Sequence, residues 1–192
     1  MTNRTCEQCG GPMPVMARAH AITCSPNCRK ARSRKRRSIP AELTARPRWV
    51  RRTSRKVPLT TGGDAASSTD PSTWSSYREA AASEVGAGLG FVLDGDGIVV
   101  LDLDHCLVDG ELLPWAQRVL DAADRTWVEV SASGDGLHVW GRGRLEHGRR
   151  ITVGGGSVEL YGDGRYIAVT GRTFGGTPQR LGDLQHVIDS LL

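Results

Sequence analysis

The sequence predicts an α+β fold, with a mainly antiparallel sheet and helices packed on one side of it, preceded by a small N-terminal finger. Three observations lead to this prediction. Short apolar runs separated by turn residues recur between residues 88 and 170, four of the five cysteines fall within the first 28 residues, and basic residues crowd the first 56. We therefore expect a finger with a basic helix at 1–37, a linker at 38–46 and a folded body at 47–192.

The four N-terminal cysteines form two close pairs, Cys6-x2-Cys9 and Cys24-x3-Cys28, separated by 14 residues. Each pair can chelate a metal, and the loop between them lets the pairs face each other around a tetrahedral zinc ion. Disulfides are the alternative, but they need an oxidising compartment, and the N-terminus lacks the apolar core of a signal peptide. The spacing therefore predicts a structural Zn²⁺ site of the zinc-ribbon or treble-clef kind. The N-terminus predicts a cytoplasmic protein.

The second cysteine pair is expected to start a basic helix. Ser25 and Pro26 are typical of an N-cap and a first helical position, which places Cys28 in the first turn. Residues 1–56 carry 15 Lys and Arg against two acids, whereas residues 57–192 carry 10 against 19. Such a basic block usually binds a polyanion, although a solvated, disordered tail is the alternative. The residues expected to contact nucleic acid are Arg29, Lys30, Arg32, Arg34, Lys35, Arg36 and Arg37.

The body is predicted to consist of short strands and few helices. A first strand begins at Trp49, residues 60–72 form a loop, and Asp70-Pro71 starts a helix. Residues 88–93 and 98–104 are expected to pair as a hairpin through the Gly-Asp-Gly turn between them. A helix from Pro114, five further strands between residues 126 and 171, and a C-terminal helix complete the domain. No apolar run approaches the ~20 residues of a membrane span, so no membrane partner is expected.

Residues 98–104, IVVLDLD, form an apolar run that ends in two carboxylates, Asp102 and Asp104. In a strand, residues i and i+2 project on the same side, so both carboxylates share one face while Leu101 and Leu103 lie on the other. Two adjacent negative charges repel unless a cation or a proton neutralises them, and carboxylate oxygens suit a divalent metal ion. The run therefore predicts a metal site; alternatively, Asp104 only opens the turn after a buried strand.

Three further segments are expected to meet this pair. The loop SASGDG precedes a strand that starts with Leu137-His138, and small residues let backbone N–H groups approach an anion, although many such loops are only hairpin turns. Glu159 is a lone carboxylate in the apolar strand SVELY, where an unpaired charge is expensive. Arg165 follows shortly after. Carboxylates that hold metals beside basic groups that hold phosphates are typical of phosphoryl chemistry.

The order LDLDH, then SASGDGLHVW, then VELYGDGRYIAVTG resembles the archaeo-eukaryotic primase superfamily, in particular the primase-polymerase-like domains of phages, prophages and plasmids. The resemblance covers roughly residues 46–192, and RKVPLTTGG is similar to the N-terminal part of these domains. It implies a catalytic core built on an RRM-like sheet, with Asp102 and Asp104 as the first motif, His138 as the second and Glu159 as the third. Gly136 stands where many members have a serine, which implies a phosphate contact from the backbone there.

The resemblance implies a template-directed DNA primase-polymerase activity that uses Mg²⁺ or Mn²⁺ held by the three acids. DNA template and nucleoside triphosphates would be the partners, together with a separately encoded helicase. The alternatives are a non-catalytic zinc-finger DNA-binding accessory protein and a metal-dependent nuclease. The residues expected to bind the nucleotide, besides His138, are Ser131, Ser133, Gly134, Gly136, Arg165 and Lys56.

Overall fold

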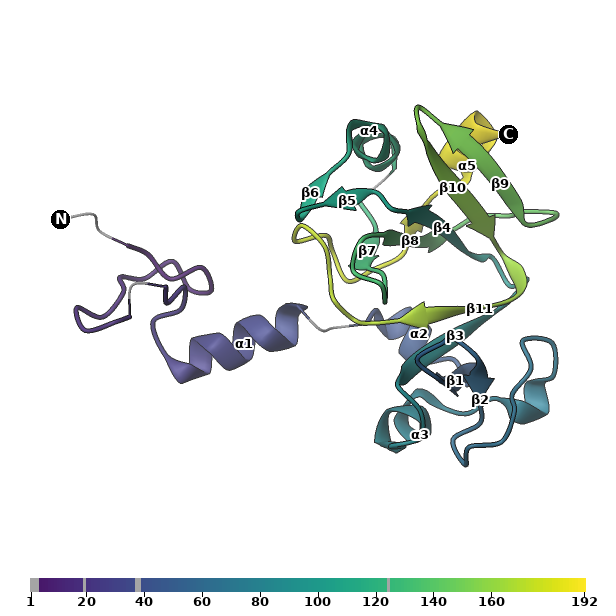
Figure 1. Cartoon of the computed structure of the whole chain (residues 1–192), viewed down its shortest axis with the longest axis horizontal. Coiled ribbons are helices and arrows are strands. Elements are labelled where there is room, and N and C mark those ends of the chain that lie inside the picture. The colour runs from purple at the N-terminus through teal and green to yellow at the C-terminus, as the bar shows by residue number, and fades with distance from the viewer. Residues whose placement is uncertain (1–3, 19, 37–38, 124) are drawn as a thin grey trace.

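The computed structural model describes residues 4–18, 20–36, 39–123 and 125–192, and the side chains of residues 33–36 lie outside this description. Figure 1 shows the finger and the first helix on one side of a body that holds all the other elements. In chain order the elements are α1 (Pro26–Arg36), α2 (Ala41–Thr44), β1 (Trp49–Arg52), β2 (Pro58–Leu59), the 3-10 helix η1 (Pro71–Thr73), α3 (Tyr77–Ala82), β3 (Gly88–Asp94), β4 (Ile98–Asp104), β5 (Leu107–Val108), β6 (Glu111–Leu112), α4 (Pro114–Ala122), β7 (Trp127–Val130), β8 (Leu137–Arg142), β9 (Arg149–Val153), β10 (Gly156–Tyr161), β11 (Asp163–Val169), β12 (Gly182–Asp183) and α5 (Gln185–Leu191).

The body is an α+β domain whose strands form two main sheets. The four-stranded sheet has the order β11-β3-β1-β2, and the six-stranded sheet has the order β12-β8-β4-β10-β9, with β7 also paired to β8. Within the described part of the chain, the strand pairs are antiparallel except β12 with β8. The predicted fold class is therefore confirmed, with the strands divided between two sheets. β4 lies at the centre of the larger sheet, so its two faces meet different parts of the core.

One face of β4 is covered by helices. Leu101 and Leu103 are fully buried and share an apolar cluster with Trp115 and Val119 of α4 and Ile188 of α5. In Figure 1, α4 lies above β4 and β8, and the four-stranded sheet lies below them. Each such buried side chain stabilises the fold by roughly 1.5–3 kcal/mol relative to exposure, so this face anchors the strand that carries the Asp pair.

The other face of β4 changes character along its length. Ile98 and Val100 belong to a second cluster, which joins the two sheets through Trp140 and Phe91. The rings of Phe91 and Trp140 are 5.9 Å apart between centroids and meet edge to face, a favourable arrangement for aromatic pairs. The final part of this face carries carboxylates and is only partly buried. The apolar half of the strand therefore fixes the position of its charged end.

The predicted hairpin of residues 88–93 and 98–104 is wrong. β3 pairs with β1 and β11, whereas β4 pairs with β8 and β10 in the other sheet. Both strands are buried on both faces over most of their length, so each is an inner strand with two neighbours of its own. Asp96 accepts hydrogen bonds of 2.9 Å from both Arg46 and Arg48. The turn between the strands is thus a connection between two sheets.

The expected linker at 38–46 also differs from the structure. Leu43 in α2 is fully buried, Ile39 packs against the same cluster, and Glu42 pairs with Arg142 at 3.0 Å. Pro40 directly precedes α2, because proline is tolerated where a helix begins. Residues 39–46 therefore belong to the body, and the part of the expected linker at residue 38 lies outside the described residues.

The helix expected from Asp70-Pro71 is divided into two elements. Asp70 caps only the short 3-10 helix η1, and α3 begins later, after Ser76. Ser76 and Glu79 form a reciprocal capping box, which satisfies two backbone N–H groups at the start of α3.

Among the described residues, no helix combines the length and apolar character that crossing a bilayer requires.

Candidate active site and metal centres

Three carboxylates from β4 and β10 meet on one face of the six-stranded sheet. Glu159 lies directly opposite Asp102 in the register of the two strands, and Asp104 lies two residues further along β4. One oxygen from each of the three carboxylates lies within 4.8 Å of the others. The structure therefore brings together the three acids that the sequence analysis selected as metal ligands.

The electrostatics of this cluster favour a cation. Asp102 Oδ1 is buried and accepts no hydrogen bond from the described residues. Burial raises the pKa of Asp102, and the charges of Asp104 and Glu159 raise it further, against the opposing effect of His138. An orphaned buried oxygen beside two more acids is costly unless a positive charge satisfies it. The hard oxygen donors of this site fit Mg²⁺ or Mn²⁺.

His138 lies in the same row of the sheet. It faces Asp102 across the β4–β8 pair, and its Nε2 atom is 3.7 Å from Asp102 Oδ1. Burial of the ring opposes its charged form, but the hydrogen bond and charge of Glu129 and the charge of Asp102 outweigh it and raise the pKa of His138. The raised pKa favours an imidazolium, which donates hydrogen bonds from both ring nitrogens.

Glu129 completes this row and was missed by the sequence analysis. Across β7, β8, β4, β10 and β9 the paired residues are Glu129, His138, Asp102, Glu159 and Arg150. Arg150 Nε is 3.7 Å from Glu159 Oε1, so the row ends in a positive charge. A signal was present, because Glu129 stands alone in the apolar strand TWVEVS just as Glu159 does in SVELY.

Arg165 reaches the cluster through an aromatic neighbour. Its Nη2 donates to the Tyr161 hydroxyl at 3.2 Å, its guanidinium lies 4.8 Å from the centre of the Tyr161 ring, and the Tyr161 hydroxyl donates to Glu159. Burial raises the pKa of Tyr161 to about 12, and the hydrogen bond to Glu159 contributes, so this hydroxyl stays protonated. Arg165 is thus held beside the carboxylates.

Lys56 comes from the other sheet. It lies in the turn between β1 and β2 with a positive φ of 59°, and its carbonyl oxygen accepts a hydrogen bond from the Tyr166 hydroxyl. Its positive charge slightly opposes the rise in the pKa of both Asp102 and His138. This basic residue therefore shares the electrostatic environment of the cluster, and its expected role in binding the nucleotide stays a prediction.

The loop at 131–136 is closed by its own hydrogen bonds. The Gly134 N–H donates to the Ser131 carbonyl at 3.2 Å, and the Gly136 N–H donates to Ser131 Oγ at 3.2 Å. The Ser131 and Ser133 hydroxyls lie 2.9 Å apart. A Cβ at Gly136 would come within 2.9 Å of the Leu103 carbonyl oxygen, so glycine allows the loop to pack against the end of β4. The Gly136 N–H, which the sequence analysis expected to contact a phosphate, therefore donates within the loop instead.

The four N-terminal cysteines also form a cluster. Their sulfur atoms lie within 4.8 Å of one another, with Cys9 Sγ 3.6 Å and Cys28 Sγ 3.5 Å from Cys24 Sγ. Four thiolates on a zinc ion with 2.3 Å bonds are separated by about 3.8 Å, so the spacing fits a tetrahedral Zn²⁺. The expected cysteine ligands thus converge in the structure.

The protonation of these thiols also fits a cation. The neighbouring thiols, Cys28 first, raise the pKa of Cys24 to about 12, so the four groups resist becoming thiolates together without a positive charge among them. Burial opposes the thiolate of Cys6, but N–H groups led by that of Cys24 lower its pKa to about 6. The Cys24 N–H lies 3.3 Å from Cys6 Sγ.

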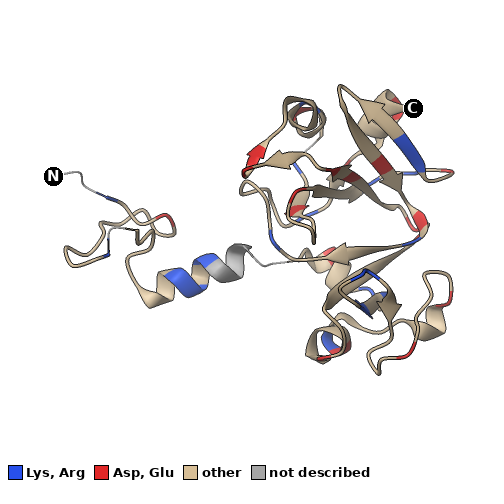
Figure 2. Ribbon diagram, in the orientation of Figure 1, with Lys and Arg blue, Asp and Glu red and all other residues tan. Residues whose placement is uncertain are grey.

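The helix that follows the second cysteine pair is the basic helix that the sequence predicts. Ser25 Oγ accepts from the Cys28 N–H at 3.1 Å, as an N-cap does, and α1 begins at Pro26. Arg29 and Lys30 are exposed. Arg32 instead forms an ion pair of 2.7 Å with Glu7, which lies between Cys6 and Cys9. Figure 2 shows the basic residues along α1. The predicted contacts Arg34, Lys35 and Arg36 have side chains outside the described part, and Arg37 lies outside it entirely.

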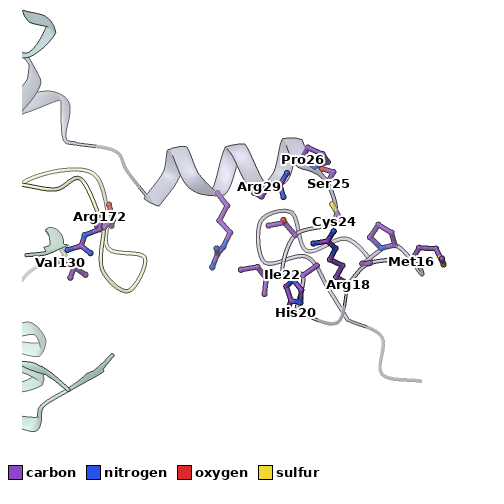
Figure 3. Close-up of a pocket in the computed structure, with 16 residues that line it drawn as sticks. Met16, Arg18, His20, Ile22, Cys24, Ser25, Pro26, Arg29, Val130 and Arg172 are labelled. Carbon is purple, nitrogen blue, oxygen red and sulfur yellow. The ribbon is translucent and has the colours of Figure 1, made fainter. Parts of the chain in front are cut away.

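A hollow lies between the finger and the end of β7 (Figure 3). Arg18, Arg29 and Arg32 line it on the finger side, and Val130 and Arg172 line it on the body side. None of the three carboxylates lines this hollow, so the candidate metal site on β4 and β10 lies outside it. The arginines make its wall positive.

The fold and the site define an α+β protein with a carboxylate cluster and a buried histidine on one sheet face, and with basic residues of both sheets near them. The chain belongs to the Prim-Pol family, because the sequence model described as "Bifunctional DNA primase/polymerase, N-terminal" matches residues 15–185. The chain is also 40% identical over 139 residues to the DNA primase-polymerase of Nitratiruptor phage NrS-1. That match covers 67% of this chain and 19% of the relative, so the chain spans about a fifth of the relative's length.

Proposed function

We propose that this chain is a primase-polymerase-like nucleotidyltransferase that joins nucleotides on a DNA template with divalent metal ions. The carboxylate cluster on β4 and β10 carries the proposal, because it combines three acids with an orphaned buried oxygen of Asp102. Membership of the Prim-Pol family and the name of the phage relative support the same activity.

Asp102, Asp104 and Glu159 would hold the Mg²⁺ or Mn²⁺ ions. When bound there, such ions activate a hydroxyl nucleophile and neutralise charge on the reacting phosphate. Tyr161 and Arg150 restrain Glu159 from two sides, so this carboxylate keeps its place opposite Asp102. The residues of the chain thus preorganise the site before a substrate arrives.

The incoming triphosphate would be held by the basic groups around the cluster. His138 would donate from Nε2, and Arg165 and Lys56 of the other sheet would supply two further positive charges near the cluster. In the loop, the Gly134 and Gly136 N–H groups donate to Ser131, whose side chain is buried, so the exposed Ser133 hydroxyl is the side chain that would most readily offer a contact to a phosphate.

The finger would bind Zn²⁺ and grip the DNA template. Cys6, Cys9, Cys24 and Cys28 hold the metal, and Arg29 and Lys30 present exposed charges on α1 to phosphates. The positive hollow between the finger and Arg172 extends this surface toward the body (Figure 3).

Primer extension with labelled nucleotides on a primed DNA template, with Mg²⁺ or Mn²⁺, tests the proposal. We expect the parent protein to extend the primer and Asp102→Asn to lose extension. Asp121→Asn is the matched control, because Asp121 is an exposed acid on α4 that accepts only from Gln117 at 2.7 Å among the described residues. DNA binding without any product would instead indicate a non-catalytic accessory protein, and metal-dependent shortening of the primer would indicate a nuclease.

A further inference from the structure

Glu129 is a carboxylate with no exposed surface, and five hydrogen bonds converge on it. Oε1 accepts from His138 Nδ1 at 3.1 Å and from Trp140 Nε1 at 3.2 Å. Oε2 accepts from the Thr170 N–H at 2.9 Å, the Thr170 hydroxyl at 3.0 Å and the Gly171 N–H at 2.8 Å. Burying a carboxylate is costly unless it is hydrogen-bonded this fully.

The partners of Glu129 determine the direction of each hydrogen bond. The Trp140 indole and the backbone of Thr170 and Gly171 offer only N–H donors, so the group at position 129 must accept on both sides. A carboxylate does this and a carboxamide cannot, because one of its two ends is itself a donor. The remaining contact on Oε1 is the Nδ1 atom of His138, which must then carry a proton.

We propose that Glu129 is a positioning residue for His138: it keeps the proton on Nδ1 and directs Nε2 toward the carboxylate cluster. The Nε2 atom lies 3.7 Å from Asp102 Oδ1, on the side where the nucleotide would bind. Carboxylates behind functional histidines commonly fix the tautomer and the ring orientation in this way. That the ligand is a nucleotide rests on the proposed function. The tautomer and orientation of the His138 ring rest on geometry alone.

Replacing Glu129 with Gln gives a specific expectation. If the amide nitrogen faces Thr170 and Gly171, it meets two backbone donors. If it faces Trp140 and His138, it meets the indole donor, and His138 Nδ1 can only accept, which moves the ring proton to Nε2. We therefore expect Glu129→Gln either to invert the neutral tautomer of His138 or to loosen the ring.

Long-range ¹H–¹⁵N NMR of the metal-free full chain reads the ring nitrogens directly. In the parent we expect Nδ1 of His138 to stay protonated across pH 6–9, whether the ring is neutral or charged. A neutral ring protonated at Nε2 in the parent would overturn the inference, and this measurement stands even if Glu129→Gln fails to fold.

Binding of a deoxynucleoside triphosphate with Mn²⁺ supplies the second readout. We expect Glu129→Gln to weaken binding by roughly tenfold or more, because the carboxylate on Nδ1 strengthens the charged hydrogen bond that Nε2 would donate to a phosphate and an amide at position 129 does not; hydrogen bonds to charged groups have about this effect. Glu42→Gln is the matched control, because Glu42 accepts from Arg142 at 3.0 Å and the Leu181 N–H at 3.3 Å within the same body. It should leave both readouts unchanged.

The two readouts separate the two ideas. If Glu129→Gln keeps the parent's Nδ1 proton and affinity, the positioning role is wrong while the proposed function stands. If the parent keeps the Nδ1 proton but binds no nucleotide, the proposed function is wrong, and the role of Glu129 is restricted to the ring itself.

Discussion

At the scale of single residues, Asp102 shows how a carboxylate of the candidate metal site lowers the stability of the fold. Its Oδ1 atom is buried without a hydrogen bond from the described residues, and burial together with Asp104 and Glu159 raises its pKa. An acid whose pKa rises on folding stabilises the fold while it is protonated. That contribution is present below the unfolded pKa of about 3.9 and is lost as the pH rises through the folded pKa. Without metal, ionisation of Asp102 above its folded pKa therefore destabilises the domain relative to low pH.

Asp102→Asn should relieve this cost. Without metal at pH 7, we expect the variant to melt at or above the melting temperature of the parent, and the difference should shrink as the pH falls toward 4. Its Mn²⁺ affinity should fall at least roughly 10–100-fold, the effect of losing even a neighbour of a metal ligand. Thermal melts and Mn²⁺ titrations check both expectations. If Asp102→Asn binds Mn²⁺ as tightly as the parent, the carboxylates are not the metal site.

The sequence was sufficient for the residues whose local pattern is unusual. Asp102 and Asp104 are spaced i, i+2 at the end of an apolar strand, and strand alternation alone places them on one face. Glu159 carries the same kind of signal, and so does Glu129. The difference is that the role of Glu129 depends on the pairing of β7 with β8, which no local pattern in the sequence specifies.

At the scale of elements, local signals predicted most helices and strands but not all of their pairings. The start of α1 at Pro26 and of α4 at Pro114 agree with the sequence, because capping and proline preferences act within one turn. The hairpin of β3 and β4 was wrong because a tight glycine turn also permits a crossing between sheets. The sequence predicts a linker where α2 lies, because the six residues between Pro40 and Pro47 carry little periodicity.

Leu43 tests whether residues 39–46 belong to the body. Its side chain is fully buried, so Leu43→Ala should lower the free energy of unfolding by roughly 2–5 kcal/mol. Urea denaturation measures this change. Ala41→Ser is the control, because Ala41 is an exposed residue of the same helix and should change stability by about 0.5 kcal/mol or less. A Leu43→Ala variant as stable as the parent would mean that the segment is a linker.

The finger should depend on its metal. The two cysteine pairs and the short helix α1 have little apolar core of their own, so metal binding should supply the free energy that folds them. We expect the purified protein to contain about one zinc per chain, and Cys24→Ser to lose it. Cys106→Ala is the control, because Cys106 is a buried thiol of the body outside the cluster. Elemental analysis and limited proteolysis measure the outcome; a zinc-free protein whose finger resists protease would contradict it.

At the scale of the whole molecule, charge separates along the chain. The first 56 residues carry a net charge of +13, and residues 57–192 carry −9, from the 15 bases and two acids of the first part and the 10 bases and 19 acids of the second. Residues 57–192 should repel DNA except where Arg150 and Arg165, together with Lys56 of the first part, lie near the carboxylates. We therefore propose that the basic part determines much of the affinity for a DNA template and that the body supplies the chemistry.

The salt dependence of DNA binding tests this division. Each phosphate contact contributes roughly 0.7–0.9 log units of affinity per tenfold change in salt, so replacing both Arg29 and Lys30 with Ala should reduce the slope by about 1 to 2. Arg32 is left in place because its ion pair with Glu7 holds the finger together. The matched control replaces Arg78 and Arg125, two exposed arginines of the body, and should keep the parent's slope. Fluorescence anisotropy with labelled DNA at several salt concentrations gives the slopes. If the α1 variant and the control have the same slope as the parent, the body binds DNA by itself despite its net negative charge.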